Sequence, residues 1–212
     1  MKTDELIAAL ASEPMGPPLR PVRIAAAVTG LVVSCFAVFL LAAGFRADLG
    51  TALTTPMIAV KTVLPALLSL LALLAVLRMM RPEGAETVRA RAVLGAVLVL
   101  SLGLYAVGFT TQARPLWFAD LTPAYVAQCL GFILLLSLPG LALAMRLVRR
   151  GASTAPVRSG AALGLAVSAG ATAGYSLYCT QDNPIFFVTW YGAAILIVTG
   201  IGALAGHRFL RW

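Results

Sequence analysis

The run IAAAVTGLVVSCFAVFLLAAG, residues Ile24–Gly44, decides the class of fold to which this chain belongs. It contains no Asp, Glu, Lys or Arg. A helix needs about 20 predominantly apolar residues to cross the hydrocarbon core of a bilayer, and this run is long enough. It therefore predicts a transmembrane helix.

Five further apolar runs follow along the chain. The second run of the chain, Thr62–Leu77, is short, and it reaches full length only if Met57–Val60 join it and Lys61 extends to the membrane interface. The others are Ala92–Thr111, Tyr125–Met145, Gly160–Tyr178 and Ile185–Gly206. The composition is 60% hydrophobic and 11% charged, whereas a soluble domain is about 25% charged. We therefore expect an all-α polytopic membrane protein, with a bundle of six transmembrane helices over residues 24–212.

The basic residues predict how this bundle is oriented. If both termini share one side, 13 of the 16 lysines and arginines fall on that side, and only Arg46, Lys61 and Arg114 on the other. Basic residues favour the cytoplasmic side, so we expect a multi-pass membrane protein with both termini in the cytoplasm. The net charge of +8 is then a topology signal, and we expect contact with membrane lipid but no direct binding of nucleic acid.

Residues 1–23 form a polar tail with two parts. Thr3 is a suitable N-cap for a short helix, and Leu6, Ile7 and Leu10 fall on one side of that helix. A proline-rich spacer follows it. Acidic residues dominate the polar face, which disfavours an anionic membrane surface. The tail therefore either docks its apolar edge into a groove of a cytoplasmic protein or remains unstructured.

Within the six runs the sequence contains no Asp or Glu, which disfavours a proton-coupled transporter. Cys35 falls in mid-membrane, where a thiol behaves as a small hydrophobe. Cys129 and Cys179 fall at similar depth on the outer, oxidising side of two consecutive helices. The sequence leaves open whether they form a structural disulfide, act as a redox or metal sensor, or only pack. The aromatic residues after Cys179 are typical of an interfacial belt; they are Phe186, Phe187, Trp190 and Tyr191.

Two stretches carry a resemblance to a known family. They are MKTDELIAALA at residues 1–11 and YSLYCTQDNP at residues 175–184, the latter followed by Trp190 and Tyr191. With six spans, cytoplasmic termini and a cysteine pair, the chain resembles the NrsF-like family. Its members are bacterial six-helix membrane anti-sigma factors that restrain extracytoplasmic-function sigma factors of the SigF type.

The resemblance implies roles for both parts of the chain. The N-terminal helix would hold the sigma factor through Leu6, Ile7 and Leu10. Cys129 and Cys179 correspond to the two periplasm-facing cysteines of the family, which are tied to release of the sigma factor under oxidative or metal stress. No catalytic residue or cofactor is expected, and no role falls to Cys35. The alternative function is a membrane thiol-disulfide oxidoreductase, although a C-x-x-C motif is absent.

Overall fold

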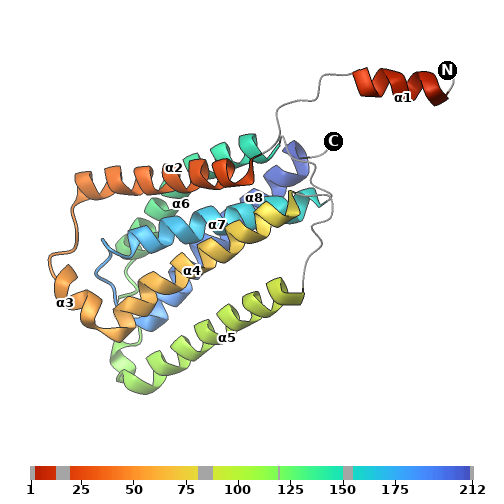
Figure 1. Ribbon diagram of the computed structural model, residues 1–212. Helices are drawn as coiled ribbons and strands as arrows, with labels where there is room; N and C mark the ends of the chain where they lie inside the picture. The colour runs from red at the N-terminus through yellow and green to blue at the C-terminus, as the bar shows by residue number, and fades with distance from the viewer. Residues whose placement is uncertain (1–2, 13–19, 81–87, 119, 150–154, 211–212) are drawn as a thin grey trace.

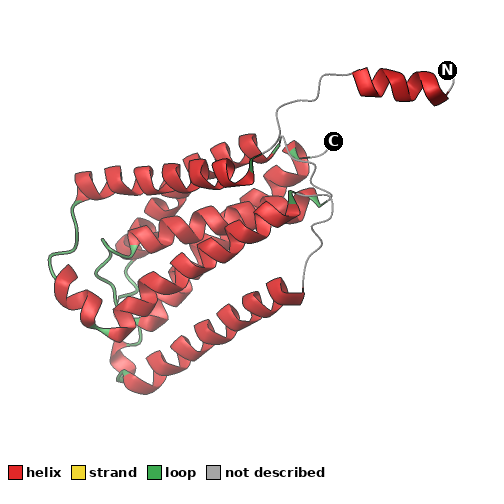
Figure 2. Cartoon of the chain, in the orientation of Figure 1, coloured by secondary structure: helices red, strands yellow, loops and turns green. Residues whose placement is uncertain are grey.

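The computed structural model describes residues 3–12, 20–80, 88–118, 120–149 and 155–210, and this part of the chain contains helices and no strand (Figure 2). The helices are α1 (Thr3–Ser12), α2 (Pro21–Ala43), α3 (Leu49–Thr54), α4 (Pro56–Met79), α5 (Val88–Thr111), a 3₁₀ turn (Arg114–Leu116), α6 (Pro123–Val148), α7 (Pro156–Tyr175) and α8 (Pro184–Phe209). The all-helical class is therefore confirmed.

Prolines set where the long helices begin. Each of α2, α4, α6, α7 and α8 starts with a proline in its first turn, at Pro21, Pro56, Pro123, Pro156 and Pro184. Proline suits the first helical position because its missing N–H would have no partner there and its φ is already helical. Each predicted apolar run coincides with one long helix. The run Gly160–Tyr178 extends beyond its helix, because α7 ends at Tyr175 and a turn follows.

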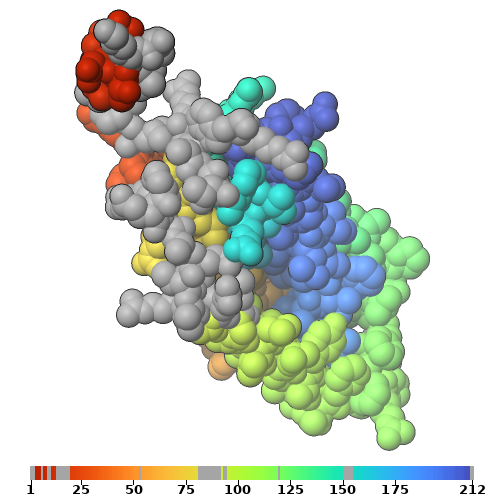
Figure 3. Space-filling model, turned by 90° about the vertical axis from the view of Figure 1, so that its right-hand side faces the viewer, coloured from red at the N-terminus to blue at the C-terminus, as the bar shows by residue number. Residues whose placement is uncertain are grey.

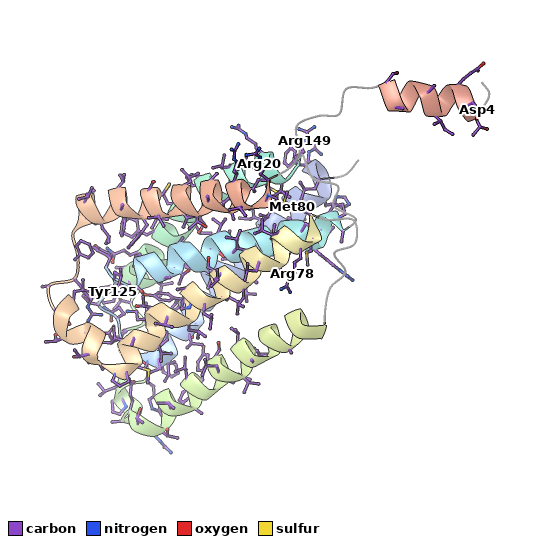
Figure 4. All side chains as sticks on the ribbon, viewed as in Figure 1. Asp4, Arg20, Arg78, Met80, Tyr125 and Arg149 are labelled. Atoms are coloured by element: carbon purple, nitrogen blue, oxygen red, sulfur yellow. The ribbon has the colours of Figure 1, made fainter. Side chains whose placement is uncertain are left out.

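The bundle is organised around α7, which packs against α8, α4, α6 and α2 (Figure 1). The neighbours of α5 are α8 and α4, and it lies at one edge of the bundle. The chain termini lie at the same end, which we call the terminal end. Arg20, Arg78 and Arg149 lie at this end, and Tyr125 lies at the opposite end (Figure 4). This distribution agrees with the charge asymmetry of the sequence.

Within the described part of the chain, four helices are long and apolar enough to cross a membrane, namely α2, α4, α6 and α8. In α5 the shorter segment Gly95–Thr111 is apolar. Helix α7 is richer in glycine, serine and threonine, and most of its side chains are buried against its neighbours. A helix enclosed by other helices does not need an apolar surface toward lipid. Four of the six predicted spans are thus supported by length and composition, and spanning by α5 and α7 remains a prediction.

Helices α7 and α8 approach most closely near the terminal end, along a contact that we call the glycine seam: Gly160 and Gly164 of α7 against Gly202 and Gly206 of α8. A Cβ atom at Gly160 would overlap the carbonyl oxygen of Gly202. A Cβ atom at Gly206 would overlap the carbonyl oxygen of Pro156. Such small-xxx-small pairs let two membrane helices pack backbone against backbone, which compensates for the lack of a hydrophobic driving force in lipid.

We expect Gly160→Ala to lower the stability of the bundle by about 1–3 kcal/mol or more, because the added methyl group meets backbone that cannot move aside. The measurement is the thermal unfolding temperature of the detergent-solubilised protein. Gly200→Ala is the matched control, since a Cβ atom at Gly200 meets nothing within 4 Å. Equal unfolding temperatures for the two variants would contradict the packing described for the seam.

Candidate functional site

The two predicted sensor cysteines lie in one buried cluster at the end of the bundle opposite the termini. Cys129 is in the second turn of α6 and Cys179 follows α7, and they are 1% and 5% exposed. The cysteine cluster consists of Leu104, Cys129, Ile133, Tyr175, Cys179, Phe186, Phe187, Tyr191 and Ala194. Both thiols are free. We call this the cysteine end of the bundle.

The aromatic residues after Cys179 are mostly part of this cluster and not a belt at the membrane surface. Phe186, Phe187 and Tyr191 are buried, and Tyr191 packs on Tyr175 with ring centres 6.0 Å apart. Helix α2 joins the cluster through Phe39, whose ring lies 5.0 Å from that of Phe132. Aromatic pairs at such distances add stabilisation beyond the area that they bury. The cluster thus connects α2, α6, α7 and α8 around the two thiols.

An open cavity of about 210 Å³ lies beside Cys179. Its walls are Phe45, Arg46, Tyr125, Gln128, Tyr175, Tyr178, Cys179, Thr180 and Gln181. Among the described residues, Cys179 lines this cavity and Cys129 does not. The two cysteines therefore differ in access to small molecules, although both are largely buried.

Two buried cations meet the segment around Cys179, and we call Arg46, Lys61, Asp48 and Asp182 the cation cluster. Arg46 donates two hydrogen bonds to the carboxylate of Asp182, at 2.9 and 2.7 Å, and two to that of Asp48, at 2.7 and 2.8 Å. The Lys61 ammonium lies 3.0 Å from the same Asp182 carboxylate. The side chains of Arg46 and Lys61 are 2% and 0% exposed.

Lys61 does not reach out to the membrane interface as the sequence led us to expect. Its ammonium donates to the backbone oxygens of Cys179 and Gln181, at 2.8 and 2.7 Å, in addition to its contact with Asp182. It also lies 5.7 Å from the centre of the Tyr191 ring, within the range of a cation–π interaction. All three donors of the ammonium group are therefore used inside the protein. The sequence signals for the pair of Lys61 and Asp182 were only a lysine within one apolar run and an aspartate shortly after another.

Charge interactions change the protonation equilibria of this cluster. Burial alone would raise the pKa of Asp182, but the hydrogen bond from Arg46 and the charge of Lys61 outweigh it and hold the pKa below its usual value. The hydrogen bond from Arg46 lowers the pKa of Asp48 in the same way. Hydrogen bonds to Asp182 and Asp48 raise the pKa of Arg46. Asp48, Asp182 and Arg46 are thus charged at neutral pH.

The predicted partner-binding residues lie on a separate helix. Helix α1 stands away from the bundle, and in the space-filling view it forms a knob at the upper edge of the molecule (Figure 3). Ile7 is 59% exposed. The side chains of Leu6 and Leu10 and the proline-rich spacer at residues 13–19 lie outside what the structure describes.

Among the described residues, no group of three or more His, Cys, Asp or Glu side chains could hold a metal ion. Cys129 and Cys179 would supply two soft ligands, which is fewer than a closed tetrahedral site requires. The arrangement thus places two buried thiols in one cluster, with a cavity and two buried cations beside Cys179.

Comparison with known proteins identifies the family. Residues 9–212 match the family model NrsF, described as a negative regulator of sigma F. The chain belongs to the NrsF family. It is 36% identical over 223 aligned positions to the anti-sigma-F factor NrsF of Caulobacter vibrioides (strain NA1000 / CB15N), with both chains fully covered. It is 34% identical over 221 positions to the probable anti-sigma-F factor NrsF of Azospira oryzae, again with full coverage. No solved structure matches the chain significantly. The predicted NrsF-like family is therefore confirmed.

We expect Asp182→Asn to lower the free energy of unfolding of this NrsF-family chain by about 3 kcal/mol, because two buried cations lose their shared counter-ion. This value is at the lower end of the range for a broken buried pair, since the carboxylate is 29% exposed. Asp48→Asn is the matched control and should have a much smaller effect, because Asp48 is 54% exposed and forms its ion pair with Arg46, whereas Asp182 pairs with both Arg46 and Lys61.

The same pair of variants gives a pH test. A carboxyl group with a lowered pKa in the folded state stabilises the fold above the pKa of the unfolded chain, about 3.9, and this contribution disappears as the pH falls through the lower, folded value. The difference between wild type and Asp182→Asn should thus stay constant around neutral pH and shrink only below about pH 4. A difference that grows on acidification would contradict the charged pairing.

We also expect Cys179 to react with thiol reagents faster than Cys129, because Cys179 lines the open cavity. The measurement uses single-cysteine chains in membranes and follows the mass added by a small water-soluble methanethiosulfonate over time. A chain that keeps only Cys35, which is half-buried on α2, reports background labelling within the span. Faster labelling of Cys129 would show that access does not come through this cavity.

Proposed function

We propose that this chain is an inner-membrane anti-sigma factor that holds an extracytoplasmic-function sigma factor through α1 and releases it on a periplasmic signal. In this arrangement the six helices α2 and α4–α8 cross the membrane. The terminal end with its arginines faces the cytoplasm, and the cysteine end faces the periplasm. Residues 1–23 act as the cytoplasmic binding tail, and residues 24–212 act as the membrane bundle.

The observation that carries the proposal is the family membership over residues 9–212. The two relatives, one named an anti-sigma-F factor and one a probable anti-sigma-F factor, align with the chain over their whole length. The position of α1 supports the binding role. It is a ten-residue helix, too short to be stable alone in water, and it presents an exposed Ile7 outside the bundle. Binding of an amphipathic helix in a groove of the sigma factor would stabilise it.

The cysteine pair supports the sensing role, because both thiols lie in one cluster at the end assigned to the periplasm. Two routes fit this arrangement. Hydrogen peroxide can take two electrons and two protons from the thiols of Cys129 and Cys179, which forms one disulfide and two molecules of water. Alternatively, both thiolates bind one soft metal ion and release two protons. Each route would change the packing of α6 against the segment after α7.

The open cavity beside Cys179 also suits the alternative function, a thiol-disulfide oxidoreductase with periplasmic partners. Such an enzyme would oxidise an added dithiol catalytically, and either single cysteine substitution would abolish turnover. The absence of turnover by purified protein, together with sigma-factor binding, would favour the anti-sigma function.

We expect Ile7→Asp to abolish binding of the sigma factor, because a charge replaces one of the three apolar anchors of the predicted contact. The measurement is co-purification of the cognate SigF-type sigma factor with the full-length, membrane-embedded chain. A photo-crosslinking residue at Leu6 should also capture the sigma factor in cells, and Leu10→Asp should prevent the capture.

Ala8→Asp is the matched control for Ile7→Asp. It adds the same charge to the same helix, but residue 8 lies on the side opposite to Leu6, Ile7 and Leu10. Retention of the sigma factor by Ala8→Asp and its loss from Ile7→Asp would establish the face of α1 that binds. If both variants retained it, the sigma factor would have to bind elsewhere on the chain.

A further inference from the structure

We propose that Arg46 is a positioning residue that couples the Cys179 segment to α2 and, through α2, to the sigma-binding tail. This inference rests on the proposed function, and it identifies the path by which a signal at the cysteines would reach α1. The path consists of the cation cluster at the cysteine end, helix α2 across the membrane, and the spacer that joins Pro21 to α1.

Arg46 is attached to the Cys179 segment at three points. Its side chain donates to the backbone oxygen of Cys179 at 3.3 Å and forms the two-pronged contact with Asp182. Its backbone N–H donates to the backbone oxygen of Leu177 at 3.3 Å. Arginine is suited to this role because its planar guanidinium bonds several acceptors in a fixed geometry. The segment 177–182 is therefore fixed to Arg46, which lies shortly after the end of α2 at Ala43.

Lys61 fixes the same segment to α4. Its ammonium and the Arg46 guanidinium both donate to the backbone oxygen of Cys179. Both also contact the Asp182 carboxylate. A displacement of the Cys179 backbone therefore changes hydrogen bonds to two buried charges at once. Because a buried charge that loses its partners is costly, such a displacement forces Arg46 and Lys61 to rearrange.

Helix α2 is the element that can respond, because a smaller share of it is buried inside the bundle than of α4, α6 or α8. Ile24, Val28 and Leu40 are its buried residues, and its remaining surface is exposed or half-buried. Gly44, with a positive φ of 84°, separates the helix from Arg46 and lets the chain turn there. Phe39 provides a second link, since its ring lies 5.1 Å from that of Tyr178 beside Cys179. The position of α2 at the cysteine end thus depends on the groups that surround Cys179.

The state with free thiols and an intact cation cluster is the state that retains the sigma factor. When Cys179 forms a bond to Cys129 or to a metal ion, its backbone oxygen leaves the two cations, and Arg46 releases the outer end of α2. Helix α2 then shifts and carries the attachment point of the tail with it. Arg46 acts after the cysteines in this sequence of events, which gives the proposal a genetic test.

The test places Arg46→Gln in a chain that already carries Cys129→Ser and Cys179→Ser. The readouts are transcription from a SigF-dependent promoter without stress and co-purification of the sigma factor with membranes. The parent chain without Cys129 and Cys179 should hold the sigma factor under stress. Added Arg46→Gln should release it without any signal and raise transcription by roughly 5- to 150-fold, the usual range of an allosteric coupling.

Three comparisons keep the result specific. Arg114→Gln is the matched control, because Arg114 is an arginine of the predicted outer side that is not part of the cation cluster. Arg46→Lys keeps one charge but cannot bond all the acceptors at once, so it should give intermediate transcription. The amount of each variant in the membrane shows whether it folds. If Arg46→Gln fails to accumulate, the Arg46→Lys variant decides the question.

The outcomes separate the two proposals. If the wild-type chain does not hold the sigma factor, or if Ile7→Asp still holds it, the proposed function or the role assigned to the tail is wrong. If wild type holds it and Ile7→Asp releases it, yet Arg46→Gln or Arg46→Lys at normal membrane levels behaves like Arg114→Gln, the coupling through Arg46 is overturned.

Discussion

The pairing of Arg46 and Lys61 with Asp182 is the interaction on which the cysteine end of this protein depends. Two cations with almost no exposed side-chain surface would be strongly unfavourable in an apolar bundle without compensation. Asp182 and the backbone oxygens of Cys179 and Gln181 provide that compensation. The cations in turn determine where the Cys179 segment lies. The thiol is therefore placed by charges that come from other parts of the chain.

Much of the architecture could be predicted from the order of the residues. The apolar runs locate the long helices because each run is long, uncharged and bounded by proline, arginine or glycine. The tail helix could be predicted from Thr3, the acidic first turn and the apolar edge. That Cys129 and Cys179 lie at the same end of the bundle follows from counting along two consecutive helices. These features depend on local sequence, so they require no knowledge of tertiary contacts.

The cation cluster could not be predicted in the same way. Lys61 near the end of an apolar run suggests a side chain that reaches water. The sequence does not show that the segment around Cys179 supplies the acceptors for its ammonium group. Phe186, Phe187 and Tyr191 look like an interfacial belt for the same reason. Helix α3 is too short to give a periodic signal. Each of these features depends on contacts between residues that are far apart in the chain.

The glycine seam has a consequence for the mechanics of the bundle. Helices α7 and α8 meet backbone against backbone near the terminal end, whereas buried aromatic side chains lie between them at the cysteine end. A small separation of the two helices at the cysteine end would cause almost no displacement at the seam. The two helices that share the seam are therefore poorly suited to carry a displacement along the bundle. A helix without such a seam, such as α2, can transfer a displacement at one end to the other.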